Sequence, residues 1–351
     1  MPFGQIVIGP PGSGKSTYCF GCNQFFNAIG RNVNIINMDP ANDSLPYQCA
    51  VDIRDFITLE EIMDEKQLGP NGGLMYALES VENSLELFSL QVKSLLQEEN
   101  SYLLFDCPGQ VELFTHHGAL FNIFKRLEKE MDLRLCVVNL IDSIYLNSAS
   151  QYISIVLLSL RSMLMMDLPQ INVFSKIDML KQYGDELPFR LDYYTDVQEL
   201  EYLQPIIEKE SSENSYMGKK LKKLTENISE IISDFNLVSF EVLCIDDKQS
   251  MINLQMVIDK ANGYVFGASE IGGDTVWAEA TRQQAGITNN VYDIQERWID
   301  NKEEYDKEEE RKRKELLKEQ EILDKPLENL SKELDPEVEW ERAVKEWEEK
   351  T

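Results

Sequence analysis

The segment GPPGSGKS at residues 9–16 limits what this chain can fold into more than any other feature. It follows a short apolar run at 4–9 that predicts a buried strand, and it opens a segment at 15–29 that predicts a helix. A glycine-rich turn in that position presents backbone N–H groups to an anion at the positive end of the helix dipole. The sequence therefore predicts a phosphate-binding loop in an α/β domain.

The same loop carries side chains suited to nucleotide phosphates. We expect Lys15 to reach the β- and γ-phosphates of a nucleotide, and the hydroxyl of Ser16 to ligate Mg²⁺. The alternative is a chance glycine-rich turn, which the flanking strand and helix argue against. The nucleotide-binding residues predicted here are Gly9, Pro10, Pro11, Gly12, Ser13, Gly14, Lys15, Ser16 and Thr17.

A second motif, DCPGQ at 106–110, follows an apolar run at 102–106 that predicts a strand. We expect Asp106 to hold Mg²⁺ through water, Gly109 to let the chain approach the γ-phosphate, and Gln110 to orient the attacking water. The alternative is a strand that ends in an ordinary Pro-Gly turn. Together with the first loop, the motif predicts a site that holds Mg²⁺ and a nucleotide triphosphate.

A third motif, SKID at 175–178, ends another apolar run and resembles the guanine-reading pattern N-K-x-D. Asp178 is expected to accept hydrogen bonds from the N1 and N2 hydrogens of guanine, a pair that adenine does not offer. Ser175 stands where the pattern has asparagine, which should weaken one supporting contact, and Lys176 completes the predicted base site. The alternative is a strand end followed by a helix-capping aspartate.

Apolar runs alternate with helical segments along most of the chain. Continuously apolar strands between helices indicate a mostly parallel sheet that helices bury on both faces. Strands are predicted at 4–9, 33–38, 102–106, 133–141, 171–175 and 237–245, a short capped helix opens at 58–61, and a long helix follows a sharp break at 69–73 and spans 74–97. We expect one domain at 1–266 with a helical insertion at 181–215, a linker at 267–300, and a charged tail, helical or mobile, at 301–351.

Composition narrows the classes of partner. The net charge of −28 disfavours direct binding to nucleic acid and to anionic membranes, because phosphate groups are repelled. The six cysteines are scattered, which is typical of a reducing compartment. The chain is expected to enter its first strand within three residues, and no apolar stretch is expected to be long enough to span a bilayer. We therefore expect a soluble intracellular protein.

With these motifs in order, the chain resembles the GPN-loop GTPases, a dimeric branch of the P-loop NTPases related to signal-recognition and metal-insertion GTPases. The resemblance covers residues 3–268 and is carried by MDPAN at 38–42, LGPNGGL at 68–74, FDCPGQVEL at 105–113, LDYYTDV at 191–197 and DKANGYVFGA at 259–268. It implies that Asp39 lies near the Mg²⁺ and the attacking water, and that Asn71 reaches across a dimer interface toward the partner's γ-phosphate.

The resemblance completes the predicted site. The catalytic candidates are Asp39, Asn71, Gln110 and Glu112, although Glu112 could equally be the ordinary first turn of a helix. The metal candidates are Ser16, Asp39 and Asp106. The implied ligands are GTP or GDP and Mg²⁺. The implied partners are a second GPN-loop GTPase, identical or different, and RNA polymerase II and III subunits or their assembly factors. This role would place the chain in the cytoplasm, with passage to the nucleus.

Two other functions stay open at this point. One is a binding module that holds GTP or GDP, hydrolyses little, and binds clients through the insertion and the tail. The other is a small-molecule kinase, which would need a second, basic acceptor site and would leave SKID without a purpose. Cys19 and Cys22 form a C-x-x-C pair on the helix after the first loop, and we interpret them as structural thiols rather than as zinc or redox ligands.

Overall fold

The computed structural model describes residues 2–42, 44–97, 101–183, 187–197, 199–210, 216–264, 294–302, 304–308, 311–312 and 314. Its contacts divide the chain into two units, Met1–Trp298 and Ile299–Thr351. Most of the predicted linker and tail lies outside the described residues, so the boundaries at 267 and 301 stay predictions. The site is built entirely within the first unit.

A single parallel sheet forms the centre of the first unit. Its seven strands have the order β3-β2-β4-β1-β5-β6-β7, and every pair is parallel, which confirms the predicted fold class. Strand β1 lies between β4 and β5. The chain runs from β1 to β2 on one side of it and later crosses from β4 to β5 on the other, and such a switch point opens a crevice at the carboxyl ends of the strands. The strands are β1 Phe3–Ile8, β2 Val33–Asn37, β3 Val51–Asp52, β4 Tyr102–Asp106, β5 Arg134–Asp142, β6 Gln170–Ser175 and β7 Phe240–Val242.

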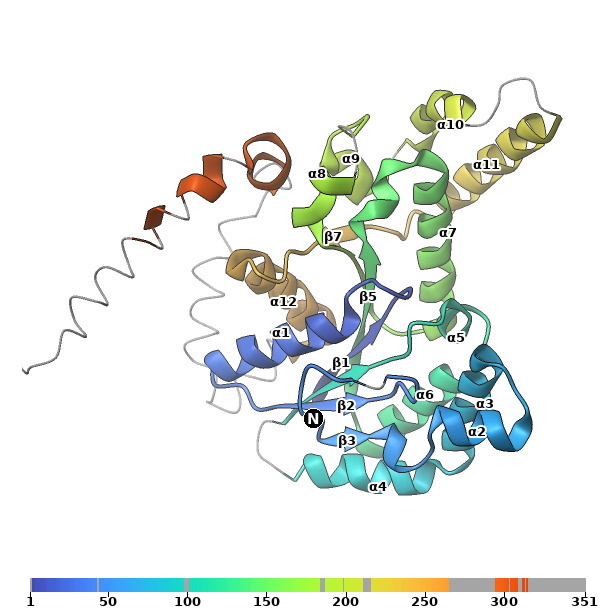
Figure 1. The fold of residues 1–351 in the computed structure, drawn as a ribbon, viewed down its shortest axis with the longest axis vertical. Coiled ribbons are helices and arrows are strands. Elements are labelled where there is room, and N and C mark those ends of the chain that lie inside the picture. Colours follow the sequence, from blue (N-terminus) through green and yellow to red (C-terminus); the bar gives the residue numbers. More distant parts are fainter. Residues whose placement is uncertain are drawn as a thin grey trace, which may run out of the picture. The chain divides into compact units, whose positions relative to one another are not determined.

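The helices cover both faces of this sheet (Figure 1). The α-helices are α1 Lys15–Ala28, α2 Leu59–Lys66, α3 Pro70–Asn83, α4 Leu85–Leu95, α5 Val111–Thr115, α6 Ala119–Met131, α7 Ala149–Met166, α8 Leu180–Tyr183, α9 Leu191–Asp196, α10 Gln204–Glu210, α11 Tyr216–Phe235 and α12 Lys248–Asn262. The short helical turns are η1 Ile53–Asp55, η2 Ser143–Asn147, η3 Ile177–Met179, η4 Leu200–Leu203 and η5 Glu296–Asp300.

Alternate residues of one strand enter the two cores. Ile6 and Ile8 pack with α3, α4 and α6, whereas Val7 between them packs with α1 and α12. Side chains in a strand point alternately to the two faces, so a strand buried on both faces is apolar at most positions. Gln5 on β1 is the exception, buried with its amide donating to Tyr102 and Gln255. The continuous apolar runs in the sequence therefore follow from the two layers of helices.

The predicted break at 69–73 and the long helix at 74–97 are wrong in detail. Helix α3 begins at Pro70, directly after Gly69, and it contains Gly72 and Gly73. A proline at the first helical position loses no hydrogen bond and brings a suitable φ angle, so it starts the helix rather than breaking the chain. Ser84 leaves helical geometry at φ −108° and ψ 26°, which divides the rest into α3 and α4. The capping box at Thr58 is confirmed as the start of α2.

Two other expectations need correction. The run at 237–245 forms only the short strand β7, and the two-residue strand β3 was not predicted. Helix α7 is long enough and apolar enough to cross a membrane, judged by length and composition alone, and it is the one such helix among the described residues. The expectation that no apolar stretch reaches this length is therefore wrong. Half of that stretch is buried inside the protein, and Arg161 on it donates a 3.0 Å hydrogen bond to the carbonyl of Thr115.

The predicted insertion at 181–215 falls between β6 and β7. There the chain forms α8, α9, η4 and α10 before the long helix α11. Tyr152 on α7 donates a 2.9 Å hydrogen bond to the carbonyl of Tyr194 on α9, and the two rings meet edge to face. This pair fastens α9 to the domain.

Candidate functional site

The phosphate loop follows β1 at the carboxyl edge of the sheet, as predicted. Gly14 takes the left-handed conformation at φ 87° directly before α1, a geometry that favours glycine. Gly9, at φ 145°, lies so close to β5 that a Cβ atom would stand 2.1 Å from the carbonyl oxygen of Leu140. These two positions explain why the turn needs glycine at both ends. Thr17 is exposed on the first turn of α1.

Lys15 folds back over this loop. Its Nζ atom donates hydrogen bonds of 3.1 Å to the carbonyls of Gly9 and Pro10. Burial lowers the pKa of Lys15, while the nearby carboxylates of Asp106 and Asp39 act in the opposite direction. The structure therefore brings the cation of the first motif together with the acidic side chains of two others.

The candidate metal ligands meet where β2 and β4 end. Asn37 pairs with Asp106 in register across these strands, which puts Asp39 and Asp106 at the same edge of the sheet. Burial raises the pKa of Asp106, whereas hydrogen bonding from Tyr47 and Ser16 and the charge of Lys15 lower it. Burial also raises the pKa of Asp39. The three predicted ligands thus lie in one neighbourhood.

This neighbourhood fits Mg²⁺. The buried Oδ1 atom of Asp106 has no hydrogen-bond partner within the described part of the chain, and such an atom is stabilised by a cation or its water. Carboxylate and hydroxyl oxygens are suitable donors, because Mg²⁺ binds proteins through one or two carboxylates and otherwise keeps water and phosphate oxygens. The described residues contain no cluster of three His, Cys, Asp or Glu side chains that could hold a metal ion.

The DCPGQ segment packs directly on the phosphate loop. A Cβ atom at Gly109 would stand 2.8 Å from Lys15 Nζ and 3.2 Å from the Cα atom of Pro11. Gln110, the next residue, donates a 2.7 Å hydrogen bond from Nε2 to Oδ1 of Asn71. Glu112 is exposed on the first turn of α5. The structure therefore brings Gln110 and Asn71 together beside the loop, within one chain.

The SKID segment is tied to the same loop. Ser175, fully buried at the end of β6, donates to the carbonyl of Ser13 at 2.7 Å and lies 3.1 Å from that of Ile141. Nζ of Lys176 donates to the carbonyl of Gly12 at 2.6 Å. The serine that stands where the pattern has asparagine thus contacts the phosphate loop through its hydroxyl. The expectation that it weakens one supporting contact stays a prediction.

Asp178 lies half-buried on η3, beyond this contact. Burial raises the pKa of Cys244, which follows β7, to about 12, and the nearby charge of Asp178 contributes to this rise. The backbone N–H of Ile177 donates to the carbonyl of Leu243 at 3.4 Å. The segment after β7 therefore lies beside the predicted base reader, which the sequence had not indicated.

Sequence reasoning missed several side chains that touch the predicted residues, and two of them bond to charged groups of the site. Asp142, at the end of β5, accepts a 2.7 Å hydrogen bond from Nζ of Lys176. Tyr47 donates a 2.5 Å hydrogen bond to Oδ2 of Asp106. The position of Asp142 at the carboxyl end of a predicted strand was a usable signal, whereas Tyr47 lies in a segment without a pattern.

The C-x-x-C pair lies inside the fold. Cys19 and Cys22 are fully buried on α1, and burial raises the pKa of both thiols, that of Cys22 to about 12. Gln255 donates a hydrogen bond to Cys22 Sγ at 3.3 Å. Protonated thiols in this setting fit the structural interpretation, because metal binding and redox exchange both need the thiolate.

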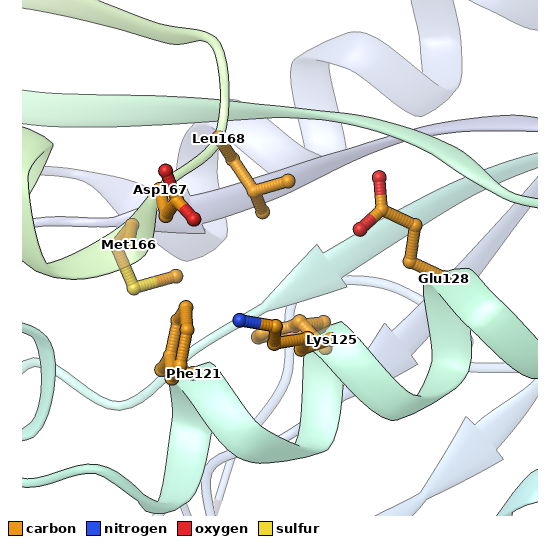
Figure 2. A pocket seen from close by; sticks show the side chains of 7 residues that line it. Phe121, Lys125, Glu128, Met166, Asp167 and Leu168 are labelled. Carbon is orange, nitrogen blue, oxygen red and sulfur yellow. The ribbon is translucent and has the colours of Figure 1, made fainter.

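A separate cavity of about 40 Å³ lies between α6 and the turn before β6. Figure 2 shows Phe121 and Lys125 of α6 facing Met166 and Leu168 across it. This volume is enough for about one water molecule, and none of the predicted site residues lines the cavity. It therefore adds nothing to the nucleotide site.

The chain is similar to known proteins over most of its length. A family described as "Conserved hypothetical ATP binding protein" matches residues 7–264. GPN-loop GTPase 2 of Saccharomyces cerevisiae is 74% identical over 350 residues, covering 100% of this chain and 98% of the relative. GPN-loop GTPase 2 of Schizosaccharomyces pombe is 48% identical over 307 residues, covering 88% of this chain and 94% of the relative.

A solved structure also has the same fold. It is a GTPase in apo form from Pyrococcus abyssi, similar at a TM-score of 0.57 and 23% identity over 74% of this chain and 97% of that chain. The family description names ATP, whereas the named relatives are GTPases. The relatives are the more specific guide, since they match the chain over nearly its full length. The chain belongs to the GPN-loop GTPase family.

Proposed function

We propose that this chain, a GTPase of the GPN-loop family, binds GTP together with Mg²⁺ and works as a dimeric switch. The observation that carries the proposal is the pair of contacts from SKID to the phosphate loop, from Ser175 to the carbonyl of Ser13 and from Lys176 to that of Gly12. These contacts join the segment that would read the base to the loop that would hold the phosphates. One nucleotide could therefore occupy both.

Each part of the site has a distinct task in this proposal. The loop would receive the phosphates, and Lys15 would exchange its contacts with backbone carbonyls for phosphate oxygens. Ser16, Asp39 and Asp106 would hold Mg²⁺ directly or through water. The ion, when bound, would neutralise charge on the phosphate oxygens.

Hydrolysis would depend on groups that orient water. Gln110 and Asn71 are the candidates because their amides adjoin the phosphate loop, and each offers a donor and an acceptor without a net charge. Dimer closure would bring Asn71 toward the nucleotide of the second subunit, and GTP would favour the closed state. Glu112, exposed at the start of α5, could contribute only if this surface becomes covered.

Base selectivity is the direct test. Binding of fluorescent GTP, GDP, ATP and XTP would be measured for the wild-type chain and for Asp178→Asn, with and without Mg²⁺. We expect the wild type to prefer guanine nucleotides and the variant to shift toward xanthine nucleotides. Asp234→Asn, an exposed change on α11, is the matched control. Equal affinity for ATP and GTP, unchanged by the substitution, would overturn the proposal.

The dimer and the client need separate tests. Light scattering should show twice the monomer mass with a non-hydrolysable GTP analogue, and a monomer under all conditions would contradict the switch. For the client we propose the role implied by the family, in assembly and nuclear import of RNA polymerase II and III by a cytoplasmic protein that passes to the nucleus. Depletion of the protein in cells should leave polymerase subunits in the cytoplasm, and unchanged subunit distribution would refute this role.

A further inference from the structure

A tyrosine outside every motif contacts the central carboxylate of the site. Tyr47 donates a 2.5 Å hydrogen bond to Oδ2 of Asp106, across 59 positions of sequence. The tyrosine is only 8% exposed, and its ring packs in the core with residues of α1 and β1. A hydroxyl held by a packed ring has little freedom to leave its partner, so it fixes the carboxylate as well.

The two oxygens of Asp106 therefore differ. Oδ2 is engaged by Tyr47, whereas Oδ1 is buried and has no hydrogen-bond partner within the described residues. The charge of Lys15 and the hydroxyl of Ser16 both act to lower the pKa of this carboxyl, so the two phosphate-loop residues lie near it. Tyr47 thus leaves one oxygen available for a cation or its water.

The segment that carries Tyr47 also carries Asp39, and it is fastened at both ends. On the β2 side, the side-chain amide of Asn37 donates to the carbonyl of Asp39 at 3.2 Å and to Oδ1 of Asp52 at 2.9 Å. On the β3 side, Arg54 donates to the carbonyl of Asn42 at 2.7 Å. The loop between β2 and β3 therefore presents Asp39 and, through Tyr47, restrains Asp106.

From this geometry we propose that Tyr47 is a positioning residue for Mg²⁺, which orients Asp106 through Oδ2 so that Oδ1 can hold the ion or its water. The proposal rests on the proposed function, because it needs Mg²⁺ at this site. Tyr47 touches neither the phosphates nor the reacting water in this scheme. Removal of the Tyr47 hydroxyl should weaken Mg²⁺ binding and leave the Mg²⁺-independent affinity for the nucleotide unchanged.

The test uses the full chain with Tyr47→Phe, which keeps the ring and removes only the hydroxyl. Affinity for a fluorescent, non-hydrolysable GTP analogue would be measured during a Mg²⁺ titration and again in EDTA. We expect the apparent Kd for Mg²⁺ to rise about tenfold, as for the loss of a hydrogen bond to a charged group, with unchanged affinity in EDTA. Hydrolysis should then recover toward the wild-type rate at high Mg²⁺.

Tyr152→Phe is the matched control, since it removes a buried tyrosine hydroxyl on α7 that bonds to a backbone carbonyl away from the site. It should leave the Mg²⁺ titration unchanged. If Tyr47→Phe titrates like the wild type, or loses affinity equally with and without Mg²⁺, the positioning role is wrong. If the wild type itself binds the analogue with no dependence on Mg²⁺, the proposed function fails first.

Discussion

The side chain of Gln110 donates a 2.7 Å hydrogen bond to Oδ1 of Asn71 within a single chain, linking the segment before α5 to the first turn of α3. Both residues are candidates for orienting water, and in this arrangement their side-chain amides are bonded to each other. The Oε1 atom of Gln110 is buried and has no partner among the described residues. The pair must therefore separate or act as a unit if either amide is to reach a water molecule.

Coupled residues should give non-additive effects on hydrolysis. We expect Asn71→Ala and Gln110→Leu each to slow single-turnover GTP hydrolysis about 100-fold, as for the loss of one preorganised donor, and the double variant to be little slower than either. Affinity for GTP should change little. Radiolabelled GTP under single-turnover conditions gives the rates, with the exposed Asn83→Ala at the far end of α3 as control. Multiplicative effects in the double variant would show that the two amides act independently, and unchanged rates would favour the binding-module function.

Ser175 should matter for both nucleotide affinity and stability. Ser175→Ala removes the hydroxyl that bonds to the carbonyl of Ser13 in a fully buried position. We expect the free energy of unfolding to fall by about 1 kcal/mol and GTP affinity to fall several-fold, because the loop loses a tie to β6. Urea denaturation and fluorescent GTP binding measure the two effects. Ser162→Ala removes another buried hydroxyl, bonded to Gln170 at 3.2 Å, and should lower stability alone. Equal GTP affinity in the wild type and in Ser175→Ala would show that this hydrogen bond does not support nucleotide binding.

The parallel sheet and the phosphate loop could be predicted because their signals are local. A strand buried on both faces is apolar at most positions, and the loop's glycines lie within one six-residue span. Tyr47 could not be predicted to bond Asp106, because pairing of β2 with β4 brings these residues together. The division at Ser84 was also missed. Asn83 and Ser84 are weak helix formers, and serine is a common N-cap, but the apolar pattern on both sides favours one continuous helix. The turn that places α3 and α4 on the sheet was therefore missed.

The corrected start of α3 leads to a prediction about stability. Gly72 is helical, and a Cβ atom there would meet only the side chain of Leu68, at 3.7 Å. Since alanine favours a helix over glycine by up to about 1 kcal/mol, Gly72→Ala should raise the free energy of unfolding by roughly 0.5–1 kcal/mol. Thermal and urea denaturation measure this change. Gly4→Ala is the contrast, because its Cβ atom would lie 2.7 Å from the carbonyl oxygen of Leu103 in the paired strand β4, and it should destabilise the fold. A loss of stability in Gly72→Ala would mean that 69–73 breaks the chain after all.

Cysteine reactivity offers a test of the loop that carries Asp39 and Tyr47. Of the six cysteines, Cys49 alone is partly exposed, and its pKa is raised by burial and by the neighbouring Asp52, to which its thiol donates at 3.4 Å. Thiolates rather than thiols react, so the native protein should label at Cys49 alone, slowly at neutral pH and faster as the pH rises. Asp52→Asn removes the negative charge that raises this pKa, so we expect several-fold faster labelling of Cys49 near pH 8, with no added sites. An absorbance assay with a disulfide reagent gives rate and stoichiometry, and Cys49→Ser should abolish the signal. Labelling of further thiols in Asp52→Asn would instead indicate that the segment between β2 and β3 opens when its anchor is lost.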